Sequence, residues 1–281
     1  MKTLPAELLR RWNGICRMRK YSFKLFSTNL RNNPKIVEEG GEYARNHNNR
    51  MFIELMVVPN TSKDDLGIIK SLLQDVEVRI HAPHHTMGFD AGNKSLEKQN
   101  QHIFSLSQYA ADLFDAKTIV VHGGCGQGQE IVSESARQIK NFNDSRIVVE
   151  NLPVIAEKEL FLSGNTPEEI SYIREKSDCG FCFDFSHALC AANYLGLDIE
   201  KQLAGFFALQ PTVYHMCDGL VDETEDKHLH FGEGNYPLSH FLNEYTANDA
   251  YITMETGHGM PESIQAWVDD FKLITSIEKE K

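Results

Sequence analysis

The sequence predicts a single-domain α/β protein, a (β/α)8 TIM barrel, and three observations support this prediction. Eight short runs rich in valine, isoleucine and phenylalanine alternate with helical stretches along the 281 residues. Strands of this kind, separated by helices, pair in parallel with both faces of the sheet covered. One such barrel takes about 250 residues, and the chain contains no linker or low-complexity stretch that would divide it. A doubly wound open sheet is the alternative architecture.

The composition fits one large domain and argues against several other classes of protein. Hydrophobic residues make up 41% of the chain, and no apolar run approaches the ~20 residues of a membrane span. The six cysteines indicate reduced thiols and a cytoplasmic protein rather than a disulfide framework. Cys179 and Cys182 have the spacing of a metal or redox pair, although buried strand cysteines are the default interpretation. A net charge of −12 argues against a strongly basic nucleic-acid surface.

Residues 1–20 are expected to form a short amphipathic lead-in, and residues 21–281 the barrel. The lead-in carries Arg10, Arg11, Arg17, Arg19 and Lys20 around scattered leucine and isoleucine. It lacks the continuous apolar segment of a secretory signal.

The first half of the chain contains four of the expected strands. They lie at residues 21–28, 52–58, 76–80 and 118–121, where alternating or β-branched side chains indicate extended structure. Helices are expected at residues 34–43, after a cap at Thr61 and Ser62, and at residues 95–114 and 130–142.

The second half supplies four more strands, at residues 146–149, 181–183, 212–214 and 251–254. Thr166 is predicted to cap a helix that has proline at its first position and acids in its first turn. Further helices are expected up to Leu209 and at residues 238–245 and 262–277.

Six consecutive strands, counting from the third, end in a histidine or an acid. The carboxyl ends of barrel strands converge on one mouth, where barrel enzymes keep their sites. That many acids and imidazoles in one dry pocket would be costly unless divalent cations removed the penalty. The sequence therefore predicts a metal site at these positions: His81, His122, Glu150, Asp184, His215 and Glu255.

The stretch from Tyr214 to Gly234 is the densest in such residues. It contains His215, Asp218, Asp226, His228 and His230, whose side-chain types zinc and manganese prefer. A solvated polar loop is the alternative interpretation, because other charged residues also crowd this stretch.

Two motifs resemble those of a known family, the endonuclease IV-like branch (AP endonuclease family 2) of the xylose isomerase-like TIM barrels. The segment from Gly180 to His187, GFCFDFSH, resembles the family's sixth-strand motif, in which the aspartate and the histidine are both ligands. The segment HMCD at residues 215–218, followed by Asp226, His228 and the sequence GEGN, resembles its seventh-strand loop. The resemblance covers about residues 81–255.

This resemblance implies a site of three zinc ions, with manganese possible in their place. In the family, the residue matching Glu150 bridges two metals, and those matching His187, Asp226 and His228 surround the third. The nine side chains of matching type are His81, His122, Glu150, Asp184, His187, His215, Asp226, His228 and Glu255.

The leading hypothesis is a metal-dependent phosphoesterase, because several cations favour phosphodiester cleavage. Glu150 and Glu255 are the expected catalytic residues, flanking the point where activated water attacks phosphorus. The substrate would be abasic DNA or a smaller phosphorylated molecule. The alternative is a sugar or sugar-phosphate isomerase or epimerase with one Mn²⁺ or Mg²⁺ on Glu150, Asp184, His215 and Glu255. A non-catalytic metal-binding barrel is a third class.

Several departures from the family motifs favour the smaller substrate. His84 stands where the family has a tyrosine, and Cys217 and Leu220 replace an asparagine and a lysine. The first strand lacks the glycine-rich loop that helps to kink DNA, and the segment around Glu54 resembles the sugar isomerases instead.

Four further residues are expected to contact the substrate or support the ligands. His84 and His85 line the pocket or cap their loop. Asp218 is predicted to orient a ligand histidine. His230, like His258, lies near ligands in the sequence and is expected beside the site or in solvent.

Overall fold

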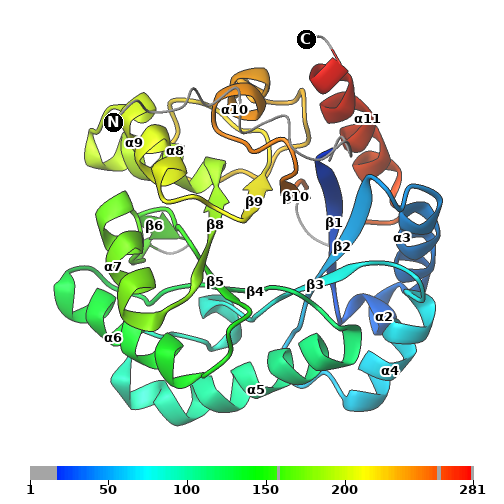
Figure 1. Cartoon of the computed structure of the whole chain (residues 1–281), viewed down its shortest axis with the longest axis horizontal. Helices are drawn as coiled ribbons and strands as arrows, with labels where there is room; N and C mark the ends of the chain where they lie inside the picture. Colours follow the sequence, from blue (N-terminus) through cyan, green and yellow to red (C-terminus); the bar gives the residue numbers. More distant parts are fainter. Residues whose placement is uncertain (1–17, 157–158, 258–260, 280–281) are drawn as a thin grey trace, which may run out of the picture.

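The computed structural model describes residues 18–156, 159–257 and 261–279. Within them the chain forms a closed, eight-stranded barrel ringed by helices (Figure 1). The barrel strands are β1 (Lys20–Phe26), β2 (Met51–Met56), β3 (Val78–His81), β4 (Ile119–Val121), β5 (Ile147–Glu150), β8 (Gly180–Asp184), β9 (Val213–Met216) and β10 (Tyr251–Met254).

The strand order is β1-β10-β9-β8-β5-β4-β3-β2, and each neighbouring pair is parallel. The prediction of a (β/α)8 barrel is confirmed, and the open sheet is excluded because β10 closes against β1. Most of the expected lead-in lies outside the described residues, so the division at residue 20 stays a prediction. In the described part of the chain, no helix is long and apolar enough to cross a membrane.

The helices lie outside the barrel, between successive strands (Figure 1). They are α2 (Asn29–Asn32), α3 (Pro34–Asn46), α4 (Lys63–Leu72), α5 (Glu97–Phe114), α6 (Gln129–Asn141), α7 (Pro167–Ser177), α8 (Phe185–Leu195), α9 (Ile199–Ala208), α10 (Leu238–Glu244) and α11 (Gln265–Lys279), with short 3₁₀ turns at His85–Met87 and Lys94–Leu96.

The predicted caps form as their sequences indicate. Ser62 Oγ accepts a hydrogen bond from the Asp65 N–H at 3.0 Å, and Asp65 accepts one from the Ser62 N–H. Thr166 accepts from the N–H of Glu169 at 3.3 Å. These side chains satisfy backbone N–H groups that have no partner inside the helix.

Two features differ from the expected elements. The helical region up to Leu209 is divided into α8 and α9, because Gly196 takes a left-handed conformation (φ 64°) that ends α8. A small antiparallel hairpin, β6 (Ile155–Ala156) with β7 (Leu160–Phe161), follows β5. Strands of two residues are too short to leave an alternating pattern in the sequence.

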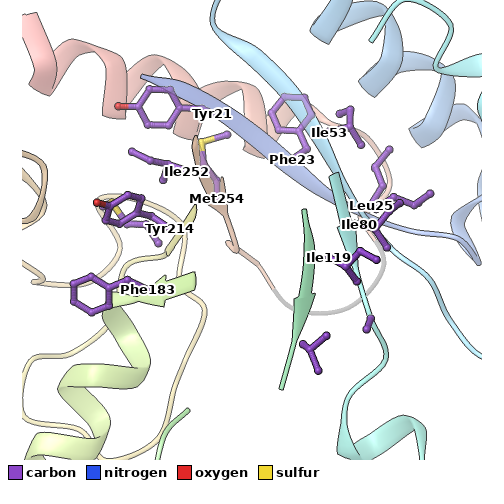
Figure 2. Packing of buried hydrophobic residues seen from close by; sticks show 14 of the residues in the cluster. Tyr21, Phe23, Leu25, Ile53, Ile80, Ile119, Phe183, Tyr214, Ile252 and Met254 are labelled. Carbon is purple, nitrogen blue, oxygen red and sulfur yellow. The ribbon is translucent and has the colours of Figure 1, made fainter. Parts of the chain in front are cut away.

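The core has an outer and an inner layer because strand side chains alternate between the two faces. Along β1, Tyr21, Phe23 and Leu25 are buried in the outer layer, between the strands and the helices (Figure 2). The inner layer is a small cluster of Val120, Val148, Cys182 and Val213. Small apolar side chains close the barrel interior beneath its carboxyl end, where the polar residues gather.

The two cysteines of the CxxC spacing do not form a pair. Cys182 lies in the inner cluster, whereas Cys179 packs against the outer one. Both are free thiols, as expected for ordinary buried cysteines of a strand.

Candidate metal centre

Glu150 lies at the centre of a group of histidines at the carboxyl end of the barrel. Its Oε2 is 3.0 Å from Nε2 of His122 and 3.3 Å from Nε2 of His81. Its Oε1 is 3.2 Å from Nδ1 of His215 and 3.3 Å from Nδ1 of His187. Each carboxylate oxygen thus faces two imidazoles, which is the arrangement of a carboxylate that connects two ion sites.

His81 and His122 end two neighbouring strands and form the first group with Glu150. His81 Nδ1 lies 2.7 Å from the backbone oxygen of Ala82. An N–H donated there leaves Nε2 with a lone pair aimed at the group. That Nε2 is buried and has no hydrogen-bond partner among the described residues.

The spacing of Asp184 and His187 follows from a helix cap. Asp184 is the N-cap of α8, and its Oδ1 accepts a hydrogen bond from the N–H of His187 at 2.7 Å. His187 is therefore fixed in the first turn, facing the same mouth as the strand ends. Its Nδ1 is 2.9 Å from the backbone oxygen of Asn151, which turns Nε2 towards the next group.

Asp226 and His228 form the third group with His187. Asp226 Oδ2 is 3.3 Å from Nε2 of His187 and 3.0 Å from Nε2 of His228. The other oxygen, Oδ1, accepts hydrogen bonds from the Ser186 hydroxyl at 2.5 Å and from the His228 N–H at 3.1 Å. Oδ2 itself is buried without a hydrogen-bond partner in the described part of the chain. A cation between these three side chains would satisfy it.

Glu255 connects His215 to the third group. Its Oε1 lies 2.7 Å from Nδ1 of His215, and its Oε2 lies 3.4 Å from Nε2 of His228. Glu150, His215 and Glu255 thus form a second group. Glu150 links it to the first group, and Glu255 links it to the third. All nine side chains that the sequence nominated as ligands meet at one end of the barrel.

Sequence reasoning missed the roles of two residues in the first two strands. Glu54 on β2 lies with its Oε2 3.0 Å from Nε2 of His215, and that oxygen also accepts from the Thr253 hydroxyl at 2.8 Å. Lys24 on β1 donates a hydrogen bond from Nζ to Oε1 of Glu255. The inward position of each in its strand was the available signal, because neighbours on either side face the outer core.

Asn151 is a third residue that the sequence did not single out. Its amide donates to the backbone oxygen of Asp184 at 2.8 Å and accepts from the Asp184 N–H at 2.8 Å. It fixes the end of β8 against the end of β5. Its position directly after Glu150 was the only signal.

The ionisation of the site follows from burial and close neighbours. Burial alone would raise the pKa of Glu150, but His215 and His122 bring this pKa well below its usual value. Burial, with Glu150 and Asp226, raises the pKa of Asp184 to about 7, against the effect of His187. Burial lowers the pKa of His122 to about 4. The last shift keeps that imidazole neutral at pH 7, the form that binds metal.

Lys24 is held in its charged form. Burial alone would lower the pKa of Lys24, but Glu255, Glu54 and Glu150 raise it above the ordinary value. One ammonium thus faces a site with five buried carboxylates, those of Glu54, Glu150, Asp184, Asp226 and Glu255. Burial alone would lower the pKa of His187 and of His215, but the neighbouring acidic groups raise both well above the ordinary value. Protons on these imidazoles, or divalent cations in their place, would balance the remaining charge. The absence of a hydrogen bond at His81 Nε2 and Asp226 Oδ2 among the described residues fits the cations.

The four predicted supporting residues lie in two places. His84, His85 and His230 line a pocket of about 1080 Å³ above the metal groups. Burial lowers the pKa of His84 to about 2, and its ring stacks 5.5 Å from that of His122. His230 Nδ1 is 2.7 Å from Oδ2 of Asp270 on α11. His258 lies outside the described residues.

Asp218 does a different job from the one predicted for it. Its carboxylate accepts hydrogen bonds from the backbone N–H groups of Gly219, Gly232, Gly234 and Tyr236, at 2.8 to 3.1 Å. It therefore orders the loop that carries Asp226 and His228. His228 itself has a positive φ of 42°, a conformation that a non-glycine residue keeps only when its surroundings impose it.

The comparisons with known proteins agree with this architecture. The model of one family, described as "Xylose isomerase-like TIM barrel", matches residues 42–277. A comparison with curated protein sequences found no match.

Three solved structures illustrate the likeness in fold. A D-tagatose 3-epimerase-like protein is 19% identical with a TM-score of 0.65, over 92% of this chain and 97% of its own. Endonuclease IV from Thermus thermophilus is also 19% identical, with a TM-score of 0.65, over 93% of this chain and 100% of its own. The IOLI protein with a bound zinc atom is 15% identical with a TM-score of 0.60, over 90% and 98%. At these identities the structural likeness supports the fold alone.

Proposed function

Because this chain belongs to the family of xylose isomerase-like TIM barrels, we propose that it is a metal-dependent phosphoesterase with a site for three cations, zinc foremost and manganese possible. One observation supports this above others. Both oxygens of Glu150 face a pair of histidines, and those histidines come from four different positions around the barrel. A site for a single cation has no need of so many ligands.

The nine side chains divide into three sets around the linking carboxylates. His81, His122 and Glu150 would hold one cation, and Glu150, Asp184, His215 and Glu255 a second. His187, Asp226 and His228 would hold the third. Bound cations would neutralise the phosphate and lower the pKa of water to about 7.

The protein's own residues prepare the remaining chemistry. Hydrolysis breaks the bond between phosphorus and the leaving oxygen, while a water oxygen adds to phosphorus and one water proton passes to the leaving oxygen. Glu150 and Glu255 both lie against Nδ1 of His215, at 3.2 and 2.7 Å, and would flank the attacking water. Lys24 holds Glu255 by an ion pair, and Glu54 holds the His215 ring from its other nitrogen.

A second candidate is a single-metal sugar or sugar-phosphate isomerase or epimerase. The contacts of Glu54 and Lys24 with His215 and Glu255 favour it, because they support the smaller set of Glu150, Asp184, His215 and Glu255. In that reaction Glu150 and Glu255 would transfer the proton. The epimerase-like structural neighbour is consistent with this candidate as well as with the fold.

The two candidates differ in metal content and in the reaction they catalyse. Protein purified without chelator should contain close to three metal equivalents and should hydrolyse bis(4-nitrophenyl) phosphate, with abasic duplex DNA assayed alongside. One equivalent, no ester hydrolysis and uptake of solvent deuterium into a ketose would instead establish the isomerase. Bound metal with neither reaction would indicate a non-catalytic barrel.

A further inference from the structure

The pocket above the metal groups has walls unlike its floor. The floor consists of ligand side chains, whereas most of the wall is apolar and comes from four parts of the chain. Phe26 and Met56 are the last residues of strands β1 and β2. The start of α11 and the segment before it contribute Pro261, Ala266 and Trp267. The remaining apolar wall lies in the segment that contains the β6–β7 hairpin and comprises Leu152, Pro153, Ile155, Ala156 and Leu162.

The indole N–H of Trp267, the largest side chain of the wall, already has a hydrogen-bond partner within the protein. Trp267 Nε1 donates a hydrogen bond to the backbone oxygen of Thr256 at 3.1 Å, and its ring stacks on Phe23 at 5.5 Å. The indole therefore offers the pocket an apolar surface on a fixed side chain. Aromatic surfaces of this kind contribute to binding by removing apolar area from water.

The hydrogen-bonding groups of the wall are imidazoles and hydroxyls. They belong to His84, His85 and His230 and to Thr28, Thr86, Thr256 and Ser263, and the described lining residues include no asparagine, glutamine or arginine. A ligand covered in hydroxyls would leave polar groups unpaired against the apolar part of the wall, which is costly. A duplex, with one charge per ~1.7 Å of its axis, needs a basic surface, but the rim here carries Glu225.

Lys24 is the only lysine or arginine among the described residues that line the pocket. Its side chain is 13% exposed, and Glu255 is the only described residue that accepts a hydrogen bond from it. An ammonium group has three donors, so donors remain for a ligand. Its place on the inner face of β1 puts this charge where the floor meets the wall.

We propose that the site takes a small phosphate ester whose organic group is apolar, and that Lys24 binds the phosphoryl oxygens of that ester. This inference rests on the proposed function and narrows its substrate class. The apolar wall covers the organic group while the charged oxygens stay at the floor. Abasic duplex DNA and hydroxyl-rich sugar phosphates fit this division poorly.

Phosphonates test the wall without turnover, because their carbon–phosphorus bond resists hydrolysis. Binding of phenylphosphonate and methylphosphonate to the metal-loaded protein is measured by calorimetry. Phenylphosphonate should bind at least ten-fold more tightly, since the two ligands share a head group and differ only in apolar area. Glucose 6-phosphate should bind no more tightly than methylphosphonate. Equal affinity for the two phosphonates, or tighter binding of the sugar phosphate or of abasic duplex, would overturn the assignment.

A pair of lysines on the same strand tests the role of Lys24. Lys24→Met should lower the affinity for both phosphonates by the same factor, about ten-fold. Lys24→Arg should recover part of this lost affinity. Lys20→Met is the matched control, because Lys20 also lies on β1 and pairs with Glu77 at 2.7 Å, but at the other end of the barrel. Its affinities should equal those of the parent protein.

All three variants are compared at full metal content, confirmed by metal analysis, and with unchanged circular dichroism. Unchanged phosphonate affinity in Lys24→Met under these conditions would exclude the lysine as the anion contact. The outcome is separable from that of the proposed function. Tight phenylphosphonate binding without ester hydrolysis would contradict the phosphoesterase proposal but support the proposed ligand class. Ester hydrolysis with equal affinity for the two phosphonates would support the phosphoesterase and contradict the ligand class.

Discussion

The two ends of the barrel differ in how their charged side chains are paired. Strand β1 has a lysine at each end, Lys20 at the amino end and Lys24 at the carboxyl end. At the amino end, Lys20 lies 2.7 Å from Glu77, and Arg79 lies 3.3 Å from the other oxygen of Glu77. At the carboxyl end, Lys24 is the one ammonium beside five carboxylates in the described part of the chain. The first end balances its charge with a lysine and an arginine, whereas at the second the balance depends on protons or cations held by the histidines.

The difference extends to how the charged groups are satisfied. The Arg79 guanidinium donates to the Thr118 hydroxyl at 3.1 Å and lies 3.5 Å from the centre of the Tyr251 ring. At the other end, Asp226 Oδ2 and His81 Nε2 are buried without a hydrogen-bond partner among the described residues. Arg79 Nε also has no hydrogen-bond partner among the described residues, so the two ends differ in the kind of group they gather rather than in full saturation. The amino end pairs a guanidinium with an acid and aromatic rings, whereas the carboxyl end collects carboxylates and imidazoles where this fold usually binds its ligands.

The largest effect is expected when the connecting carboxylate is neutralised. Glu150→Gln should lose at least one metal equivalent and more than about 100-fold in activity, beyond the usual cost of altering a residue that only supports a ligand. Glu77→Gln is the matched control at the amino end and should keep its metal. Metal analysis and ester hydrolysis measure both. Full metal content in Glu150→Gln would contradict its connecting role.

Removal of metal should lower the thermal stability of the parent protein. Ligands at 100 times their dissociation constant stabilise by about 2.7 kcal/mol, so chelator should lower Tm by about 5–10 °C. Readdition of Zn²⁺ or Mn²⁺ should restore it. The same treatment of Glu150→Gln should cause a smaller shift, because part of the metal is already absent. If chelator does not change the Tm of the parent protein, the carboxyl end of the barrel does not bind stabilising cations.

A smaller effect is expected from Glu54, which contacts a ligand histidine from behind. Glu54→Gln preserves the shape of the side chain but removes the charge that holds Nε2 of His215 at 3.0 Å. Such changes typically cost about 10–100-fold in metal affinity. Titration against a chromophoric chelator measures this, with Glu77→Gln again as the control. Equal affinities in the two variants would show that Glu54 only fills space.

The fold was accessible from sequence because each barrel strand leaves a local pattern, and six of the nine candidate ligands stand at or next to the end of a strand. His122 and Glu150 illustrate this, since each stands where an apolar run stops. Lys24 and Glu54 were not accessible in the same way. Both lie within strands, where an isolated charge in an alternating run also suits a solvent-facing position, and only closure of the barrel turns them inward. The role of Asp218 depends on the path of residues 219–236, which no local pattern fixes.

The smallest effect is expected at the balanced end. Lys20→Met removes one partner of Glu77, but Arg79 stays 3.3 Å from that carboxylate. Lys20 and Glu77 are both partly exposed, at 26% and 31%, and pairs of this kind contribute at most about 1 kcal/mol. Tm should therefore fall by no more than about 2–4 °C, and metal content should stay the same. A loss of metal in this variant would show that the two ends of the barrel are coupled through β1, and the contrast between them would no longer hold.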